Sequence, residues 1–403
     1  MLGNMVARTN FKHIGLLVYG RFPTEKAYGG HVFEIAKSFT ELGIKTTVFF
    51  SKTNNKKSIY EDPHKYYGID SEINFVEVNN FDFTRFKIYD LLPSFLRKIF
   101  WNIGSVIWSK IHSDQFLECD LLWSTNPNLL TPQRRKNKVL IYEKHGAAKY
   151  FQKLSIKILS KDKNCFFVGT SKTSYNELNG LSSKNTIYLP NGVDLERYLP
   201  NSKTFSSTIN IGYIGMLETY QNDKGVADSF KVLKKLAHNY DISVTLIGDP
   251  ENYRQAIDKE FVDSGVKYLS KKRVPLGEVA KEISKLDIGI VPYPSEYHME
   301  TYASPMKIFE YAAAGAVIIA SDIKSHKDLS ELNLGIKYFE KDNFDDFENK
   351  LKELLENRNL IEELHNLSIN NIAKFTWNNR SKKLINFASV AQLDRAPDFG
   401  SGG

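Results

Sequence analysis

The sequence contains little cysteine: Cys119 and Cys165 are its only two in 403 residues. Two cysteines cannot build a disulfide framework, and they are too few for a four-ligand zinc site. Long apolar runs are missing as well. The run at residues 14–19 is shorter than a signal-peptide core, and no segment reaches the ~18 apolar residues that span a bilayer. We therefore predict a cytoplasmic protein that is neither exported nor inserted into a membrane.

An excess of charge of one sign is also missing over most of the chain. There are 54 basic and 47 acidic residues, a formal net charge of +7. Residues 134–163 hold ten of the basic residues against only Glu143 and Asp162, so the remainder is close to neutral. Such a basic segment attracts lipid headgroups, diphosphates or nucleic acid. Nucleic acid is the weakest of the three, because the segment has no interleaved aromatic residues to stack on bases.

Short apolar strands alternate with amphipathic helices along the chain. Apolar residues make up 42% and charged residues 25%, which are ordinary globular values, and the length predicts two or three domains. Strands are predicted at 13–19, 46–50, 73–78, 121–123, 139–142, 165–169, 186–189, 210–214, 243–247, 288–291 and 317–320. The repeated strand, glycine-bearing loop, helix, strand order predicts an α/β fold with two doubly wound, Rossmann-like domains.

The composition changes twice along the chain. Residues 200–208 are rich in Pro, Asn, Ser, Thr and Lys, as is typical of a linker, and predict a boundary between domains at 1–200 and 201–375. A last helix is predicted at 376–388. Residues 389–403 show no apolar period and end in glycine and serine, so we predict a disordered tail without a function.

The segment from Ser304 to Gly315 has the pattern of a capped helix. Ser304 suits the N-cap, Pro305 the first helical position and Gly315 a left-handed stop. Free N–H groups at such a helix start attract anions, and Lys307 adds a positive charge in the same turn. Glu310 projects from the same face and suits a sugar hydroxyl. A surface helix with an exposed Lys and Glu fits the spacing equally well.

A second glycine segment precedes a lysine. Gly212 and Gly215 belong to or follow a predicted strand, and Lys224 and Gly225 stand at the start of the next helix. Glycines let the backbone approach a ligand, and a lysine there can bind a phosphate. The third glycine and the acidic residue of a dinucleotide fingerprint are missing, so a nicotinamide cofactor is not expected. An exposed first-turn lysine is the alternative for Lys224.

These motifs together resemble a known family. Gly29-Gly30, Asn191-Gly192-Val193-Asp194, Lys224-Gly225 and Ser304 to Gly315 occur in this order and resemble glycosyltransferase family 4, of the "glycosyl transferases group 1" type. The resemblance runs from about residue 13 to residue 387. It implies the GT-B fold, in which an acceptor-side domain (1–200) and a nucleotide-sugar domain (201–375) face each other across a cleft, and the last helix packs back toward the first domain.

The resemblance also implies roles for single residues. Lys224 and Lys307 would contact the donor diphosphate, Glu310 the nucleotide ribose, and His145 the transferred sugar; these four are the expected catalytic residues. Taken alone, His145 is more often a loop or core histidine. The donor-binding residues implied are Gly29, Gly30, Gly215, Lys224, Ser304, Pro305, Met306, Lys307 and Glu310, with Lys272, Arg273 and Val274 at the base pocket.

The implied reaction is the retaining transfer of a sugar from a nucleotide diphosphate to a glycan, lipid-linked or small-molecule acceptor, in cell-envelope or polysaccharide biosynthesis. Lysines and helix N–H groups can stabilise the leaving diphosphate, and no Asp-x-Asp or His/Cys cluster suggests a metal, so we expect no metal and no cofactor. Two positions depart from the family pattern: Met216 replaces an Arg and Tyr302 a Glu. A non-catalytic nucleotide-sugar-binding or partner subunit and a sugar-nucleotide epimerase therefore remain alternatives.

The basic segment contains a regular lysine stripe. Lys149, Lys153, Lys157 and Lys161 recur every four residues and lie on one face of a predicted helix that also carries apolar residues. Such a helix can rest on an anionic membrane surface. The sequence therefore predicts peripheral contact with the inner face of a membrane, with a solvated helix face as the alternative.

Overall fold

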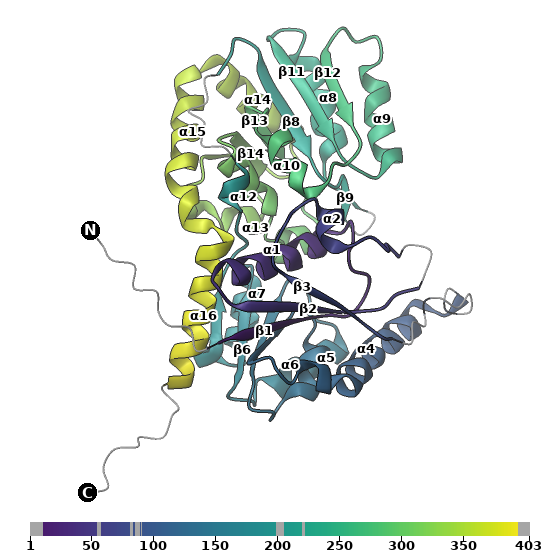
Figure 1. Ribbon diagram of the computed structural model, residues 1–403. Helices are drawn as coiled ribbons and strands as arrows, with labels where there is room; N and C mark the ends of the chain where they lie inside the picture. Colours follow the sequence, from purple (N-terminus) through teal and green to yellow (C-terminus); the bar gives the residue numbers. More distant parts are fainter. Residues whose placement is uncertain are drawn as a thin grey trace, which may run out of the picture. The chain divides into compact units, whose positions relative to one another are not determined.

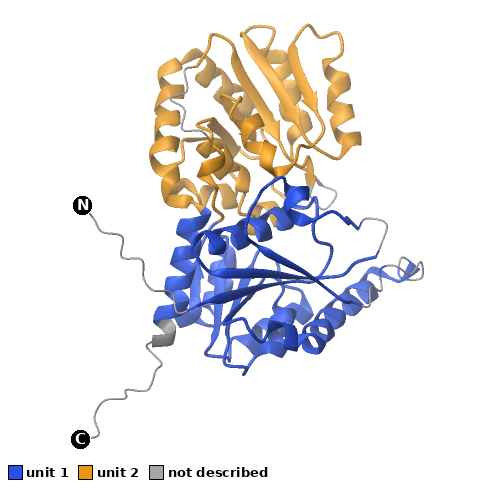
Figure 2. Cartoon of the chain, viewed as in Figure 1, with its two compact units in different colours: residues 1–190, 377–403 blue, residues 191–376 orange. Residues whose placement is uncertain are grey.

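The computed structural model describes residues 11–54, 58–80, 84, 89, 91–198, 205–219 and 222–393. The chain forms two compact units, one of residues 1–190 with 377–403 and the other of residues 191–376 (Figure 2). The sequence predicted the boundary at residue 200. It lies at Pro190 because Asn191 is hydrogen-bonded to Ser304 and Val193 bridges to Thr376, both within the second unit. Residues 199–204 of the predicted linker lie outside the described residues.

The first unit is built on a seven-stranded sheet in the order β3-β2-β1-β4-β5-β6-β7, in which the strands pair in parallel. The strands are β1 His13–Val18, β2 Lys45–Ser51, β3 Asn74–Val78, β4 Leu121–Ser124, β5 Val139–Lys144, β6 Cys165–Gly169 and β7 Thr186–Tyr188. Strands β1, β4, β5 and β6 are buried along their whole length, because helices cover both faces of a parallel sheet.

Helices of the first unit lie on both sides of this sheet. They are α1 Ala27–Glu41, α2 Pro63–Tyr67, α4 Ser94–Ile111, α5 Pro127–Leu130, α6 Tyr150–Leu159, α7 Lys172–Asn179 and α16 Trp377–Leu393. Figure 1 shows α1 on one side and α4, α5 and α6 on the other, where α5 packs between α4 and α6. Asn128 of α5 donates to Asn102 of α4 and accepts a hydrogen bond from Ser155 of α6.

The last helix, α16, returns to the first unit and packs along α1. The Ser38 and Ser381 hydroxyls are 2.5 Å apart, and the Phe387 ring meets Phe166 edge-on. The helix continues to Leu393, so the first five residues of the predicted tail are helical. The physical reason is that residues 389–393 contain no glycine or proline and include good helix formers. Residues 394–403 lie outside the described residues.

The second unit has a six-stranded sheet in the order β12-β11-β8-β13-β14-β15, again with parallel pairing, and a short β9-β10 hairpin. The strands are β8 Ile209–Ile214, β9 Glu218–Thr219, β10 Asn222–Asp223, β11 Ile242–Ile247, β12 Lys267–Lys271, β13 Ile288–Val291, β14 Val317–Ser321 and β15 Ile336–Phe339. The two sheets confirm the predicted α/β fold of two doubly wound domains. Strand β15 was not predicted, because only its last residue is buried and it lacks an apolar run.

The helices of the second unit connect these strands and enclose one large apolar core. They are α8 Val226–Leu236, α9 Glu251–Phe261, α10 Leu276–Ile283, α11 Tyr297–Tyr302, α12 Met306–Ala313, α13 Lys324–Lys327, α14 Phe344–Glu356 and α15 Arg358–Ile372. Among the helices that the structure describes in either unit, none combines the length and apolar character needed to cross a membrane.

Candidate functional site

The sheet of the second unit has its topological switch point between β8 and β13. From β8 the chain continues outward through β11 and β12, and it then returns to the other side of β8 with β13. Ligands of open α/β sheets bind outside the carboxyl ends of the strands at such a point. Gly215 follows β8 directly, Tyr293 follows β13, and α12 carries Lys307 toward the same edge.

Gly215 lies where the Lys307 side chain crosses the end of β8. The Lys307 Nζ donates a hydrogen bond to the Ile214 carbonyl at 2.6 Å and lies 5.1 Å from the centre of the Tyr213 ring. A Cβ on Gly215 would come within 1.9 Å of that nitrogen, and its φ of +143° favours glycine. The glycine that the sequence associated with ligand approach therefore first makes room for this lysine.

Lys224 is buried at the start of the next helix, beside Gly225. Its Nζ lies 5.3 Å from the centre of the Tyr293 ring. Burial, with a further contribution from the charge of Lys307, lowers the pKa of Lys224 to about 7, and Glu218 opposes the shift. Gly225 has a φ of +75°, and a Cβ there would lie 2.2 Å from the Pro292 carbonyl oxygen. The exposed first-turn lysine that was the alternative for Lys224 is thereby excluded.

Glu310 is the acidic member of this group. Burial raises the pKa of its carboxyl, while the positive charges of Lys307 and Arg197 oppose the shift. Burial likewise lowers the pKa of Lys307, and Glu310 opposes that change. Arg197 has its own partner, Asp194, at 3.0 Å. Lys307 has Glu310 nearby and Lys224 has Glu218, yet burial still lowers the pKa of both lysines. An anion bound between the strand ends would relieve the cost of holding both charged.

The helix that carries Lys307 and Glu310 begins one residue later than predicted. Helix α12 starts at Met306, Pro305 occupies the N-cap, and no side chain caps the helix. The Ser304 hydroxyl instead accepts a hydrogen bond from the Asn191 N–H at 3.1 Å, and the Ser304 carbonyl accepts one from the Asn191 side chain at 2.7 Å. Since Ser304 is held this way, its predicted capping role is wrong. The left-handed stop is confirmed at Gly315, whose φ is +68°.

The two positions that depart from the family pattern carry no substitute charge. Met216 is half-buried, and its carbonyl accepts a hydrogen bond from Tyr213. Tyr302 is buried, with its hydroxyl 3.4 Å from that of Tyr297. Glu300, two residues away, forms an ion pair with Lys341 at 2.5 Å and accepts a hydrogen bond from Ser295. It is therefore engaged elsewhere.

The remaining residues expected at the donor site divide between the units. Lys272, Arg273 and Val274 follow β12 at the carboxyl edge of the second sheet, and Val274 packs against the core. Gly29 and Gly30 lie in the first turn of α1, in the first unit. A Cβ on Gly29 would approach the Tyr67 hydroxyl to 2.3 Å, so helix packing by itself requires this glycine.

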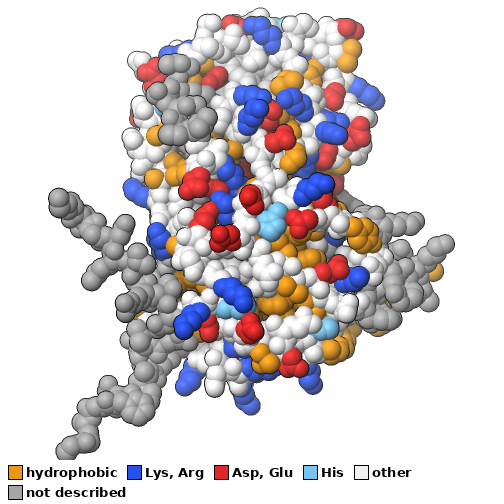
Figure 3. Space-filling view, viewed as in Figure 1, with side chains coloured by type: hydrophobic (Ala, Val, Ile, Leu, Met, Phe, Trp, Pro, Cys, Tyr) orange, Lys and Arg blue, Asp and Glu red, His pale blue; other side chains and the backbone are white. Residues whose placement is uncertain are grey.

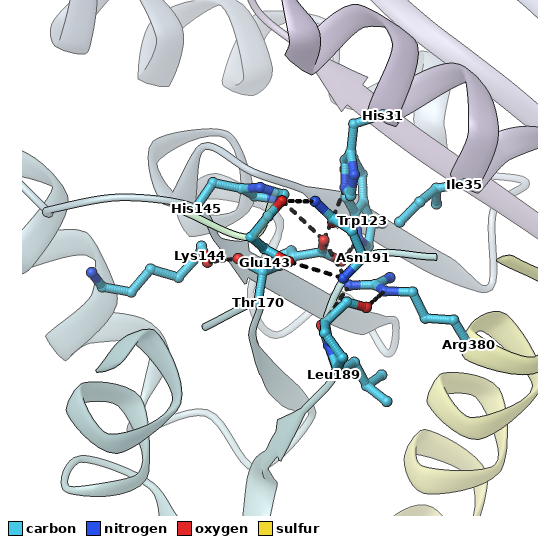
Figure 4. A network of polar contacts seen from close by, with 12 residues as sticks. His31, Ile35, Trp123, Glu143, Lys144, His145, Thr170, Leu189, Asn191 and Arg380 are labelled. Carbon is cyan, nitrogen blue, oxygen red and sulfur yellow. Dashed lines mark hydrogen bonds and ion pairs between the residues drawn. The ribbon is translucent and has the colours of Figure 1, made fainter. Parts of the chain in front are cut away.

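His145 belongs to a buried polar cluster of the first unit, shown in Figure 4. Its Nε2 lies 3.0 Å from Oε1 of Glu143, the fully buried last-but-one residue of β5. The same oxygen lies 2.9 Å from His31 Nε2 and 2.8 Å from a guanidinium nitrogen of Arg380, and the other oxygen accepts a hydrogen bond from Trp123. We refer to Glu143, His31, His145, Arg380 and Trp123 as the Glu143 cluster.

The charges of this cluster are balanced. Burial acts against ionisation of Glu143, but Arg380, His31 and the hydrogen bond from His145 hold the pKa of its carboxyl well below the usual range. Burial, with the charges of His145 and Arg380, lowers the pKa of His31 to about 4, so His31 is neutral at pH 7. One carboxylate therefore faces one guanidinium and neutral His31.

The cluster also contains the residue types of a metal site. In the part of the chain that the structure describes, His31, Glu143 and His145 are the only three metal-ligating side chains whose ligand atoms gather within 4.8 Å. The guanidinium of Arg380 contacts the same carboxylate oxygen that a metal would use. A divalent cation there would stand beside a fixed positive charge, so these residues suit an ion pair better than a metal centre.

Sequence reasoning missed several of these residues. Glu143 and His31 lie within two residues of the selected His145 and Gly29-Gly30, but their pairing joins separate elements. Arg380 donates to the Pro190 and Leu189 carbonyls from a helix that carried no charge signal. Asn191 lies in a recognised motif, whose physical role is its pair of hydrogen bonds to Ser304.

Known proteins resemble this chain in its second unit and in its fold. Residues 208–357 match the family model described as "Glycosyl transferases group 1". No curated protein matches the chain in sequence. Similar solved structures include Anabaena HepE in complex with UDP, at 12% identity and a TM-score of 0.67 over 94% of this chain and 100% of that one.

Two further structures cover almost the whole chain. A glycosyltransferase from Rickettsia africae is 16% identical with a TM-score of 0.67, over 96% of this chain and 100% of that one. Sucrose-phosphate synthase from Thermosynechococcus elongatus is 15% identical with a TM-score of 0.66, over 95% and 100%. The chain therefore has the GT-B fold of glycosyltransferases, and its second unit matches the glycosyl transferases group 1 model.

Proposed function

We propose that this chain is a retaining glycosyltransferase of family 4, which moves a sugar from a nucleotide diphosphate to an acceptor. The acceptor class is a glycan, a lipid-linked saccharide or a small molecule, as in cell-envelope or polysaccharide biosynthesis. One observation carries the proposal. Two lysines, Lys224 and Lys307, lie at the switch point of a unit that matches glycosyl transferases, and burial lowers the pKa of both although Glu218 and Glu310 oppose the shifts.

The lysines suit the chemistry of the leaving group. Negative charge grows on the nucleotide diphosphate while the anomeric carbon becomes cationic, and preorganised positive groups stabilise that charge separation. Lys307 is held in place by the Ile214 carbonyl, and Lys224 by its burial against Tyr293. In this proposal Glu310, one turn after Lys307 on α12, accepts hydrogen bonds from the ribose hydroxyls. We assign the catalytic roles to Lys224, Lys307, Glu310 and, at the sugar, His145.

The proposed mechanism uses no metal and no cofactor. The two lysines and the first N–H groups of α12 supply the positive charge that a divalent cation supplies in other transferases. We propose retention of configuration by front-face attack within an ion-pair-like transition state. Turnover should therefore persist in a chelator. A loss that magnesium or manganese restores would contradict this part of the proposal.

The test is a screen of the purified chain against a panel of nucleotide sugars, with release of the nucleotide as the readout. UDP sugars come first, because the Anabaena HepE structure holds UDP. Lys307→Ala is the matched control, since it should lose release but keep the fold. Binding without release from any donor would support the alternative of a non-catalytic subunit, which Met216 and the engaged Glu300 favour. Conversion of the donor without an acceptor would indicate an epimerase.

We further propose that the protein works in the cytoplasm, at the inner face of a membrane. Lys149, Lys153, Lys157 and Lys161 are all exposed along α6 and its two ends. Each lysine close to an anionic surface contributes about 1 kcal/mol. Changing all four to Gln should lower co-sedimentation with anionic vesicles. Equal binding of anionic vesicles by the parent and by the variant with all four lysines changed to Gln would show that these lysines do not contribute to membrane contact.

A further inference from the structure

Helix α4 of the first unit presents its apolar residues outward. Phe100, Ile103, Ile107 and Ile111 follow helical spacing and so lie on one face. Their exposed fractions are 40%, 45%, 49% and 67%. A surface helix normally directs such a stripe toward the core and its polar residues to water. The orientation of α4 is the reverse of this arrangement.

The interior face of α4 contains Trp108 and otherwise small or polar residues. Ser105 and Ser109 are fully buried, and the Ser109 hydroxyl donates a hydrogen bond to the Leu129 carbonyl at 2.5 Å. Gln133 donates to the Ser109 carbonyl at 2.7 Å. A Cβ on Gly104 would lie 2.6 Å from the Tyr19 hydroxyl. These contacts fix the rotation of the helix about its axis. The packing of the unit therefore determines that the isoleucines face outward.

The charged residues of the helices on this side of the sheet have one sign, and the nearest acidic residue, Asp114, follows the end of α4. Helix α4 contains Arg97, Lys98 and Lys110 and no acidic residue, and α6 contains Lys153 and Lys157 and no acidic residue. Both helices pack against α5 on the same side of the sheet. Figure 3 shows acidic and basic side chains intermingled on the face that it presents, unlike the charges of these two helices. An apolar stripe on a helix whose own charges are all positive complements an anionic lipid surface.

We propose that the outward stripe of α4 (Phe100, Ile103, Ile107 and Ile111) inserts into the headgroup layer of an anionic membrane while the lysines of α6 contact the lipid phosphates. The inference extends the membrane contact of the proposed function, and it assigns the apolar half of that contact to α4. Lipid fits better than a protein partner, because every charged residue of α4 and α6 is basic, whereas a mixed protein interface pairs residues of both signs. The long stems of lysine and arginine allow their charges to reach the phosphates while the isoleucines enter the layer.

The test compares the full chain with the triple variant Ile103→Gln, Ile107→Gln, Ile111→Gln. Co-sedimentation is measured with vesicles of phosphatidylcholine alone and with added phosphatidylglycerol. We expect the parent to bind the anionic vesicles and the variant to bind them at least about tenfold more weakly, because three apolar side chains no longer leave water. Val262→Gln is the matched control, because Val262 is an exposed apolar residue of the second unit.

Trp101 of α4 provides a direct readout in the parent protein. It is partly exposed, whereas Trp108, Trp123 and Trp377 are buried. Lipids brominated in the upper acyl chain should therefore quench Trp101 when the parent binds anionic vesicles. Binding without quenching, or equal binding by the parent and the triple variant, would overturn the proposal. A stripe that holds a second copy would appear as a dimer that the triple variant abolishes, with no vesicle binding, and this result would also overturn it.

Failure of the membrane inference and failure of the proposed activity are separable. Nucleotide release from a donor is measured in the absence of vesicles, and the triple variant should release nucleotide at the parent rate, because α4 belongs to the first unit and the lysines of the donor site to the second. Vesicle binding without release would leave the α4 inference standing and remove the transferase proposal. Nucleotide release without vesicle binding would leave the transferase proposal standing and remove the α4 inference.

Discussion

The Glu143 cluster of the first unit and the lysine pair of the second, in which Lys224 is buried and Lys307 half-buried, are groups of charges that differ in balance. In the cluster, the Glu143 carboxylate has Arg380 at 2.8 Å and polar contacts to His31, His145 and Trp123. In the pair, Glu218 acts on Lys224 and Glu310 on Lys307, but burial still lowers the pKa of both lysines. A balanced buried group holds a fold together, whereas an unbalanced one is prepared for a ligand of opposite charge.

Removing the carboxylate of the cluster should have the largest effect. Glu143→Ala leaves Arg380 buried without its partner, and loss of one member of a buried pair costs about 3–5 kcal/mol. Denaturant unfolding of the first unit should shift by that amount, while nucleotide binding by the second unit is retained. Glu177→Ala is the control, because Glu177 pairs with Lys144 at 2.8 Å but is partly exposed. A Glu143→Ala protein as stable as the parent would show that the cluster does not hold the unit together.

Removing a lysine of the pair should instead affect turnover. Lys307→Ala is expected to lower kcat by roughly 30- to 1000-fold, about 2–4 kcal/mol, because Lys307 faces charge that grows during the reaction. The melting temperature should change little. Lys231→Ala, an exposed lysine paired with Asp228, serves as the control. Met216→Arg, which restores a missing cation, should raise turnover. Parent-like release by Lys307→Ala would place the donor elsewhere.

Removing Glu310, the carboxylate beside Lys307, should weaken nucleotide binding more than it lowers turnover. Glu310→Ala loses hydrogen bonds to ribose hydroxyls that are present in the ground and transition states alike. Nucleotide binding should therefore weaken by about 1.5–3 kcal/mol, while kcat is largely kept. Calorimetric titration with UDP provides the measurement. A drop in kcat at unchanged affinity would contradict the ribose assignment and indicate a role at the reacting sugar.

The smallest effect is a pH dependence of donor binding. The pKa of Lys224 in the free protein is about 7, so the lysine loses its charge as the pH rises through that value, and an anionic donor then binds less well. Affinity for a nucleotide-diphosphate sugar should fall by about tenfold between pH 7 and pH 8.5. Lys224→Arg keeps its charge and should remove the dependence. A flat profile in the parent would mean that Lys224 does not meet the donor charge.

The periodic features of this protein could be read from its sequence. Runs such as residues 165–169 and 288–291 became strands with the predicted bounds, because a strand covered on both faces must be continuously apolar. The left-handed stop at Gly315 was also predictable, since few residues other than glycine adopt that conformation. The candidate site came from the Lys224-Gly225 and Ser304 to Gly315 motifs, whose order along the chain is visible without a structure.

Contacts between distant residues depended on the tertiary structure. The Ser304 hydroxyl could cap α12 by sequence, but Asn191, far away along the chain, engages it. Glu143 and Arg380 show no shared pattern, because their pairing requires that α16 return to the first unit. The α4 pattern indicates an amphipathic helix, yet only packing against Leu129 and Gln133 turns its apolar face outward. Local periodicity is set by backbone geometry, whereas the partner of a side chain is set by which elements the fold brings together.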